Sequence, residues 1–284
     1  MSSPVLHDRL SCHPWMVPQR ARLPGLWPVD RAEWLIRDEC YGAQMALRTT
    51  LFRTARSKVF QVASGYEQRA HAASATLLET VITTLNADGS FAVDGAGAAP
   101  SSKARFIITP DGRAINPDKD HSLIALGHLV QEDFAILASD ETGHYRLIAG
   151  IICFPASWTL AQKIGRGLTA LHGPVAAYDD GLAGRMNRIF TALPAHQLLG
   201  RANVLIYEDA NLHQPRKEGE NKPLQPGGAR FIRVERQTLY PMGLPSGARV
   251  VVFSIHTSVV TAARLAAYDP VAFAKLKSLR PEIV

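Results

Sequence analysis

The stretch KIGRGLTALHGPV, residues 163–175, ends a helix-like run at His172, directly before a Gly-Pro pair. An imidazole is a common ligand for metals, including haem iron, when an acceptor holds its second nitrogen. A histidine at the C-terminus of a helix also interacts favourably with the helix dipole and then needs no chemical role. The residue types alone leave both interpretations open.

Two basic residues, Lys163 and Arg166, precede His172 in the same run. Residues three apart on a helix lie on neighbouring faces. They either face solvent or donate charge-assisted hydrogen bonds to the carboxylates of a ligand. Tyr178 follows the histidine and adds a hydroxyl donor.

Other polar residues lie on segments that read as strands. Arg201 and Asn203 are two residues apart at the start of one such segment, so their side chains project to the same side. Glu235 and Arg236 are adjacent in RFIRVERQTLY, residues 230–240, so they face opposite sides. Only one of these two is expected to meet a pocket, and the sequence leaves open which.

The elements that position these residues are helices and short strands. Strands are predicted at residues 133–139, 145–154, 202–208, 230–240 and 248–260, and helices at 30–54, 67–87, 158–171, 180–193 and 270–279. Asp30 with Glu33 predicts the start of the first helix, and Asp269 with Pro270 predicts the start of the last. The order predicts an α+β fold, with a mostly antiparallel sheet and its helices grouped on one face.

Composition limits the class of protein. The 284 residues are 46% hydrophobic, which suits one large or two modest domains. We expect an N-terminal helical region, 1–105, that packs on a core, 106–284, as one integrated domain. No apolar run is long enough to span a bilayer, and the N-terminus lacks the layout of a secretory signal.

Cysteine usage and charge restrict the cofactors and partners. The three cysteines are widely spaced, which predicts a reduced, cytoplasmic protein without a disulfide framework, a zinc site or an iron–sulfur site. The net charge is +6, but the basic residues are scattered, so we expect no nucleic-acid partner. Such a basic surface suits an acidic protein partner.

Several motifs occur together in a characteristic order. They are VQEDFAIL (130–137), FPASW (154–158), KIGRGLTALHGPV (163–175), RAN (201–203), RVERQTL (233–239) and GLPSGARVVVFSI (243–255). With the N-terminal pattern of Trp15, Trp34, Leu35, Asp38, Tyr41, Arg48 and Leu51, they resemble the α subunit of haem-dependent oxidative N-demethylase and its relatives. The resemblance covers nearly the whole chain.

The resemblance implies a fold and an activity. The fold would be similar to that of haem-binding PAS sensors, with a five-stranded antiparallel sheet, helices that cover a haem b pocket, and an N-terminal helical extension. The activity would be monooxygenase-type oxidative demethylation of a small secondary amine, such as dimethylamine, with O2. Electrons would come from NADPH through FMN and a 2Fe-2S centre on partner subunits.

The resemblance also implies roles for residues. His172 would be the proximal ligand of the haem iron, with His128, His256 and Cys153 as alternatives. Lys163, Arg166 and Tyr178 would bind the haem propionates. Arg201, with Asn203 beside it, would stabilise bound oxygen, and Glu235 or Arg236 would meet the amine substrate.

The chain departs from the family pattern at Ala176, Val204 and Ser258. These departures motivate a second hypothesis, a PAS-like haem or gas-binding module without catalysis. A third is a structural subunit without a cofactor, which would purify free of haem even after haem supplementation.

Overall fold

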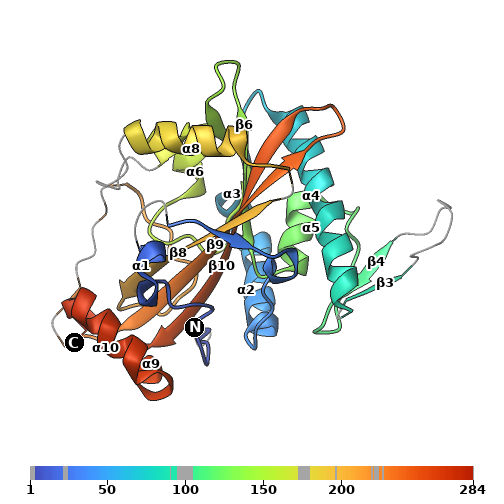
Figure 1. Cartoon of the computed structure of the whole chain (residues 1–284). Helices are drawn as coiled ribbons and strands as arrows, with labels where there is room; N and C mark the ends of the chain where they lie inside the picture. Colours follow the sequence, from blue (N-terminus) through green and yellow to red (C-terminus); the bar gives the residue numbers. More distant parts are fainter. Residues whose placement is uncertain are drawn as a thin grey trace.

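The computed structural model describes residues 4–21, 25–89, 91–94, 105–171, 180–195, 197–218, 220, 224–225 and 227–283. These residues form an α+β fold (Figure 1), as the element order in the sequence predicts. Among them, no helix is both long enough and apolar enough to cross a membrane.

Seven strands form the main sheet, in the order β1-β8-β9-β10-β6-β7-β2, and each neighbouring pair is antiparallel. Their bounds are β1 Trp27–Val29, β2 Phe60–Val62, β6 Asp133–Ser139, β7 Tyr145–Ile151, β8 Leu198–Tyr207, β9 Phe231–Gly243 and β10 Arg249–Thr261. The five strands predicted from the sequence are the inner five. The expectation of a five-stranded sheet is wrong in number, because β1 and β2 extend its two edges from the region expected to be helical.

Helices cover both faces of the sheet, so the expectation that they group on one face is wrong. On one face, Phe134, Ile136 and Val252 pack in the cluster that contains the apolar side of helix α4, Glu67–Asp88. We call this the α4 face. On the other face, Leu137 and Val251 pack against helix α8, Asp180–Ala192, and we call this the α8 face. The two helices lie on opposite sides of the strands (Figure 1). Successive strand residues point to opposite faces, so both faces need apolar cover.

The α4 face is also covered by α2, Tyr41–Thr54, and α5, Ser122–Leu129. The predicted helix at 30–54 thus begins eleven residues later than expected. Asp30 caps only a short 3-10 helix, η2 Arg31–Glu33, and its side chain makes no capping hydrogen bond. The reason is tertiary: the indole of Trp34 donates to Ser254 Oγ on β10 at 3.0 Å, and residues 34–40 form bends and a turn instead of a helix.

The predicted helix at 158–171 is broken into α6, Leu160–Lys163, and α7, Leu168–Leu171. Gly165 lies between them with φ of 77°, a conformation that favours glycine. The backbone there pairs with β7 instead, since Leu147 N–H donates to Arg166 O and Gly165 N–H donates to Leu147 O. Residues 165–166 therefore pair with the edge of β7 and do not continue the helix.

The remaining elements complete the ends and edges. They are η1 Pro14–Met16, α1 Pro18–Ala21, α3 Arg56–Val59, the small sheet of β3 Ala92–Asp94, β4 Phe106–Ile108 and β5 Ala114–Ile115, and α9 Ala262–Tyr268, α10 Pro270–Leu279 and η3 Pro281–Ile283. The sequence RFIITPDGRAI, residues 105–115, has a Pro-Asp-Gly turn between two short extended pieces, which predicts a hairpin, and β4 and β5 form it. The predicted start of the last helix is confirmed too, because Asp269 Oδ1 accepts the Ala272 N–H at 2.9 Å.

Candidate functional site

A patch of polar side chains lies on the α8 face, where β8 and β9 pair. Arg201 is the register partner of Gln237, and Asn203 is the register partner of Glu235. Arg201 Nη2 donates to Asn203 Oδ1 at 2.9 Å, and Gln237 Nε2 donates to Glu235 Oε2 at 3.2 Å. Two residues from each strand, spaced by two, therefore meet on one face, as the alternation predicts.

The β9 side of the patch is buried and ionic, whereas Arg201 and Asn203 on β8 are half-buried. Glu235 forms a buried ion pair with Arg233, at 3.1 Å between Oε1 and Nη2. Arg233 also donates to Leu212 O at 2.8 Å and to Phe154 O. Oε1 of Gln237 is buried and has no hydrogen-bond partner within the described part of the chain. A buried acceptor without a donor is unfavourable, so it marks a place where a ligand can donate.

Apolar side chains on the same face border this patch. Ala135, Leu147 and Leu160 are buried together. Half-buried apolar residues pack against them, namely Trp158, Ile164, Leu171 and Phe253. Half-buried apolar residues between a sheet and its covering helices are typical of the lining of a ligand site.

Lys163 and Arg166 meet at one acidic residue. Lys163 Nζ lies 2.8 Å from Glu218 Oε1, and Arg166 Nη1 lies 3.4 Å from the same atom. Lys163 is buried although it is a lysine, whereas Arg166 is exposed. The two cations hold the pKa of the Glu218 carboxyl below its usual range, chiefly through the Lys163 hydrogen bond. These contacts with Glu218 were not predicted from the sequence, because Glu218 lies more than fifty residues from both cations.

Arg236 lies on the opposite face from Glu235 and donates to Trp34 O at 3.3 Å. Of the two adjacent residues, Glu235 is thus the one that shares a face with Arg201 and Asn203. His172 and Tyr178 lie outside the described residues. His172 directly follows Leu171, the last residue of α7, whose side chain packs on the α8 face.

The alternative iron ligands are in unsuitable surroundings. The ring of His128, on α5, makes an edge contact with Phe52 at 4.6 Å between centroids, within the helices of the α4 face. The thiol of Cys153 is fully buried, and burial raises its pKa, so the thiolate that iron prefers is disfavoured. His256 points to the α4 face and is bound there by two carboxylates.

His128 makes the stability of the fold sensitive to acid. Burial, with Arg113 nearby, lowers the pKa of His128 to about 4. Between the ordinary histidine value of about 6.5 and pH 4, the unfolded chain binds a proton that the folded chain does not, so stability falls as pH drops through this range. We expect a loss of about 1 kcal/mol between pH 7 and pH 5, after allowance for screening of a half-buried ring.

The measurement is urea unfolding at pH 7 and pH 5 for the parent and His128→Gln. The neutral glutamine is expected to remove this part of the acid loss. An equal loss in both proteins would show that another group is responsible. His144→Gln, at an exposed position, is the control.

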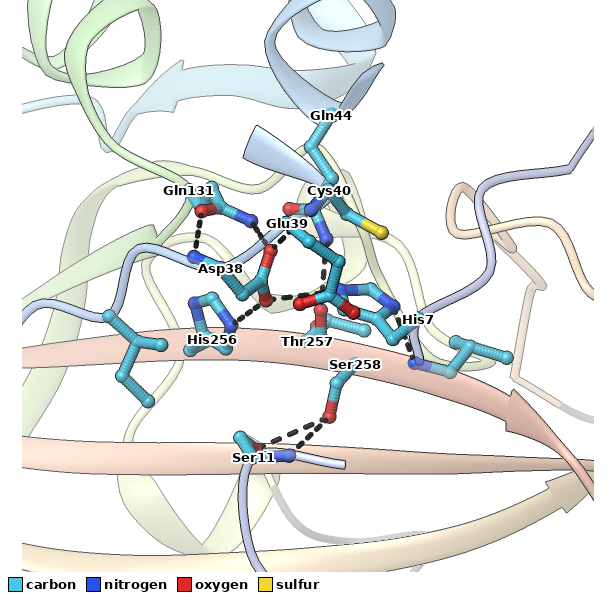
Figure 2. Close-up of polar contacts among 12 residues, drawn as sticks. His7, Ser11, Asp38, Glu39, Cys40, Gln44, Gln131, His256, Thr257 and Ser258 are labelled. Atoms are coloured by element: carbon cyan, nitrogen blue, oxygen red, sulfur yellow. Dashed lines mark hydrogen bonds and ion pairs between the residues drawn. The ribbon is translucent and has the colours of Figure 1, made fainter. Parts of the chain in front are cut away.

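A second polar cluster lies on the α4 face and was not predicted from the sequence (Figure 2). Asp38 Oδ2 accepts hydrogen bonds from His256 Nε2 at 2.9 Å and from His7 Nε2 at 3.2 Å. Asp38 Oδ1 accepts from Gln131 at 2.7 Å and from the Cys40 N–H at 3.0 Å. Two of its members were singled out in the sequence, Asp38 in the N-terminal family pattern and His256 as an alternative iron ligand, but nothing there brought them together.

Both histidines of this cluster are drawn toward the charged form by Asp38. Burial opposes the charged form of His7, but its hydrogen bond to Asp38 outweighs this and raises the pKa of His7 to about 9. Burial also opposes the charged form of His256, but the hydrogen bond to Asp38 and the nearby Glu132 outweigh it and raise the pKa of His256 to about 9. Burial would also raise the pKa of the Asp38 carboxyl, yet the hydrogen bonds from His256 and His7 hold it well below its usual range. The Asp38 carboxylate and the His256 imidazolium, 2.9 Å apart, therefore form a charge-assisted hydrogen bond.

The fold and the candidate site define a class: an α+β protein with a polar patch, a candidate small-molecule site, on one face of an antiparallel sheet. Residues 25–283 match the family model described as haem-dependent oxidative N-demethylase, alpha subunit-like. The chain belongs to this family. Comparison with curated proteins gives no match. The name of the family describes a haem-dependent enzyme of the oxidative N-demethylase type, and the words alpha subunit imply that such an enzyme has more than one component.

Proposed function

We propose that the chain binds haem b on the α8 face and uses it, with O2, to demethylate a small secondary amine such as dimethylamine. One observation carries this proposal. The polar patch of Arg201, Asn203, Glu235 and Gln237 adjoins half-buried apolar residues, on the face where α7 ends directly before His172. A haem needs such an apolar surface, one axial ligand and cations for its propionates.

The residues present fit haem. The orphaned Oε1 of Gln237 and the half-buried Phe253 and Leu171 mark a surface that a bound group would cover. His172 would be the axial ligand, and Lys163, Arg166 and Tyr178 would bind the propionates. Bound haem would supply the redox-active iron that oxidation of an amine by O2 requires.

The patch residues would position the substrate. A secondary amine is a cation at neutral pH, and the carboxylate of Glu235 and the amide oxygen of Gln237 are acceptors for its N–H groups. Arg233 shares the charge of Glu235, so the carboxylate is held in place and its attraction for the cation is moderated. Arg201 would donate hydrogen bonds toward negative charge that develops on reduced oxygen.

Electrons would arrive from a partner. The family is described as alpha subunit-like, and in keeping with that we place FMN and the 2Fe-2S centre on a partner reductase that oxidises NADPH. The net charge of +6 favours association with an acidic partner, which would make the rate of electron transfer fall with salt.

Lys163 provides a test of the propionate role. Lys163→Met is expected to weaken haem binding about tenfold, since one charge-assisted hydrogen bond is lost. Glu218→Gln is the matched control, because it frees Lys163 from its ion pair and is expected to leave haem affinity equal or higher. Haem titration followed by absorbance measures both. Equal weakening in the two variants would mean that the Lys163–Glu218 pair acts only on the fold.

The proposed activity is tested with haem-loaded protein, NADPH and a ferredoxin-type reductase, over a series of methylated amines. We expect O2 consumption and formaldehyde release that depend on the amine. A haem protein that shows neither with any amine would contradict the enzymatic proposal.

One observation favours the alternative of a gas-binding module. Both oxygens of Glu235 are already engaged, one by Arg233 and one by Gln237, which leaves less attraction for an ammonium group. Reversible binding of O2 or CO to the reduced protein, without turnover of any amine, would support this alternative.

A further inference from the structure

Three residues on the α4 face bring nitrogen, oxygen and sulfur together. Among the described residues, the ligand atoms of His7, Asp38 and Cys40 all lie within 4.8 Å of one another. His7 Nε2 and Asp38 Oδ2 are 3.2 Å apart, a separation that two ligands of one tetrahedral ion can have. We propose that His7, Asp38 and Cys40 form a binding site for a divalent transition-metal ion of the zinc class.

The surroundings already hold the ligands in place (Figure 2). The Cys40 N–H donates to Asp38 Oδ1 at 3.0 Å, and Gln131 Nε2 donates to the same oxygen at 2.7 Å. His256 Nε2 donates to Asp38 Oδ2 at 2.9 Å. Outer hydrogen bonds of this kind orient the ligands of a metal and support its affinity.

A second observation points to a ligand. Gln44 is fully buried, and its Oε1 has no hydrogen-bond partner in the described part of the chain. The Nε2 atom of Gln44 lies 3.2 Å from Nε2 of His7. Both nitrogens carry hydrogen, the first as part of an amide and the second because it donates to Asp38, so two donors face each other. A half-turn of the amide would give up the 3.1 Å hydrogen bond from Nε2 to Thr257 O and bring the orphaned oxygen to the His7 side, as a fourth ligand for the ion.

Metal binding would rearrange two protons. The Cys40 thiol, which now donates to Leu6 O at 3.3 Å, would lose its proton to solvent. The proton on His7 Nε2 would move to Nδ1, so the Val259 N–H would give up its 3.1 Å hydrogen bond to that atom. With a neutral amide as the fourth ligand and this lost bond, we expect a dissociation constant of about 1 μM, weaker than that of structural zinc fingers.

The ion would join two segments of the chain. His7 belongs to the N-terminal arm, residues 4–13, which precedes the family match at residue 25. Asp38 and Cys40 belong to the family region, directly before α2. The arm is otherwise held to β10 by contacts such as the His7 N–H to Val259 O bond, at 2.8 Å. A bound ion would fasten the arm and raise the melting temperature.

The test is metal binding by the full chain after chelator treatment, with zinc titrated against a chromophoric chelator and cobalt as a spectroscopic probe. We expect one zinc ion per chain and a thiolate-to-cobalt charge-transfer band. Cys40→Ser and His7→Gln are each expected to weaken zinc binding by at least about tenfold. Serine retains a donor for Leu6 O, so Cys40→Ser is expected to keep the fold, which circular dichroism checks.

Two control variants separate this site from others. Cys12→Ser changes another cysteine of the N-terminal segment and is expected to bind zinc as the parent does. His172→Ala is expected to leave zinc binding unchanged, which excludes capture of the ion at the proposed haem ligand. Zinc binding that survives Cys40→Ser and His7→Gln unchanged, or no stoichiometric binding by the parent, would overturn the proposal.

Discussion

Glu235→Gln is expected to abolish most amine-dependent turnover and to destabilise the fold. The substitution removes the carboxylate proposed to hold the substrate cation, and loss of a positioned charge of this kind lowers kcat/KM by about 100-fold or more. It also leaves the guanidinium of Arg233 buried without its counterion, which costs about 3 kcal/mol. The assays are formaldehyde release and urea unfolding.

A double variant separates these two effects. Arg233→Leu/Glu235→Leu removes the whole ion pair, and apolar replacement of a buried pair is often neutral for stability. We expect the double variant to recover much of the stability but none of the activity. Recovery of activity together with stability would show that Glu235 serves only as the counterion of Arg233.

Arg48→Met is expected to lower the free energy of unfolding by about 3 kcal/mol, because it leaves the buried carboxylate of Asp133 without its cation. Arg48 and Asp133 are fully buried and 2.8 Å apart, and Asp133 also accepts the N–H groups of Cys153 and Phe154. The expected loss of stability lies near the lower end of the range for breaking a buried ion pair. The reason is that Nε and Nη1 of Arg48 have no hydrogen-bond partner among the described residues, so the substitution removes few hydrogen bonds.

Arg53→Met, at an exposed position of the same helix, is the matched control and is expected to change the free energy of unfolding by less than about 0.5 kcal/mol. Urea unfolding at pH 7 measures both variants. A similar, small change in the two would mean that water or a local rearrangement compensates Asp133.

The strands of the core could be predicted from the sequence because each carries an unbroken run of apolar or alternating residues. Residues 133–139 were predicted without error as β6. The two edge strands were missed because each is only three residues long and forms through pairing with a distant partner. The helix at 30–54 was predicted too long, since a contact of Trp34 with Ser254, 220 residues away, overrides its local capping pattern.

The candidate site was predictable to the level of strand faces. The alternation of side chains along a strand is enough to place Arg201 with Asn203, and Glu235 opposite Arg236. The partners of these residues were not predictable, because Arg233 reaches Phe154 O and Leu212 O across distant segments. The cluster of His7, Asp38 and His256 was not predicted for the same reason. His7 lies 31 residues from Asp38 in the sequence, and His256 lies 218 residues from it.

The most direct test of haem binding through His172 is an absorption spectrum of the full chain expressed with a haem precursor. Spectra are recorded for the oxidised, reduced and CO-bound protein, and for His172→Ala and the control His144→Ala. If His172 ligates haem, we expect one haem per chain, with a Soret band that is lost or markedly shifted in His172→Ala and retained in His144→Ala. A colourless parent, or a spectrum unchanged by His172→Ala, would contradict it.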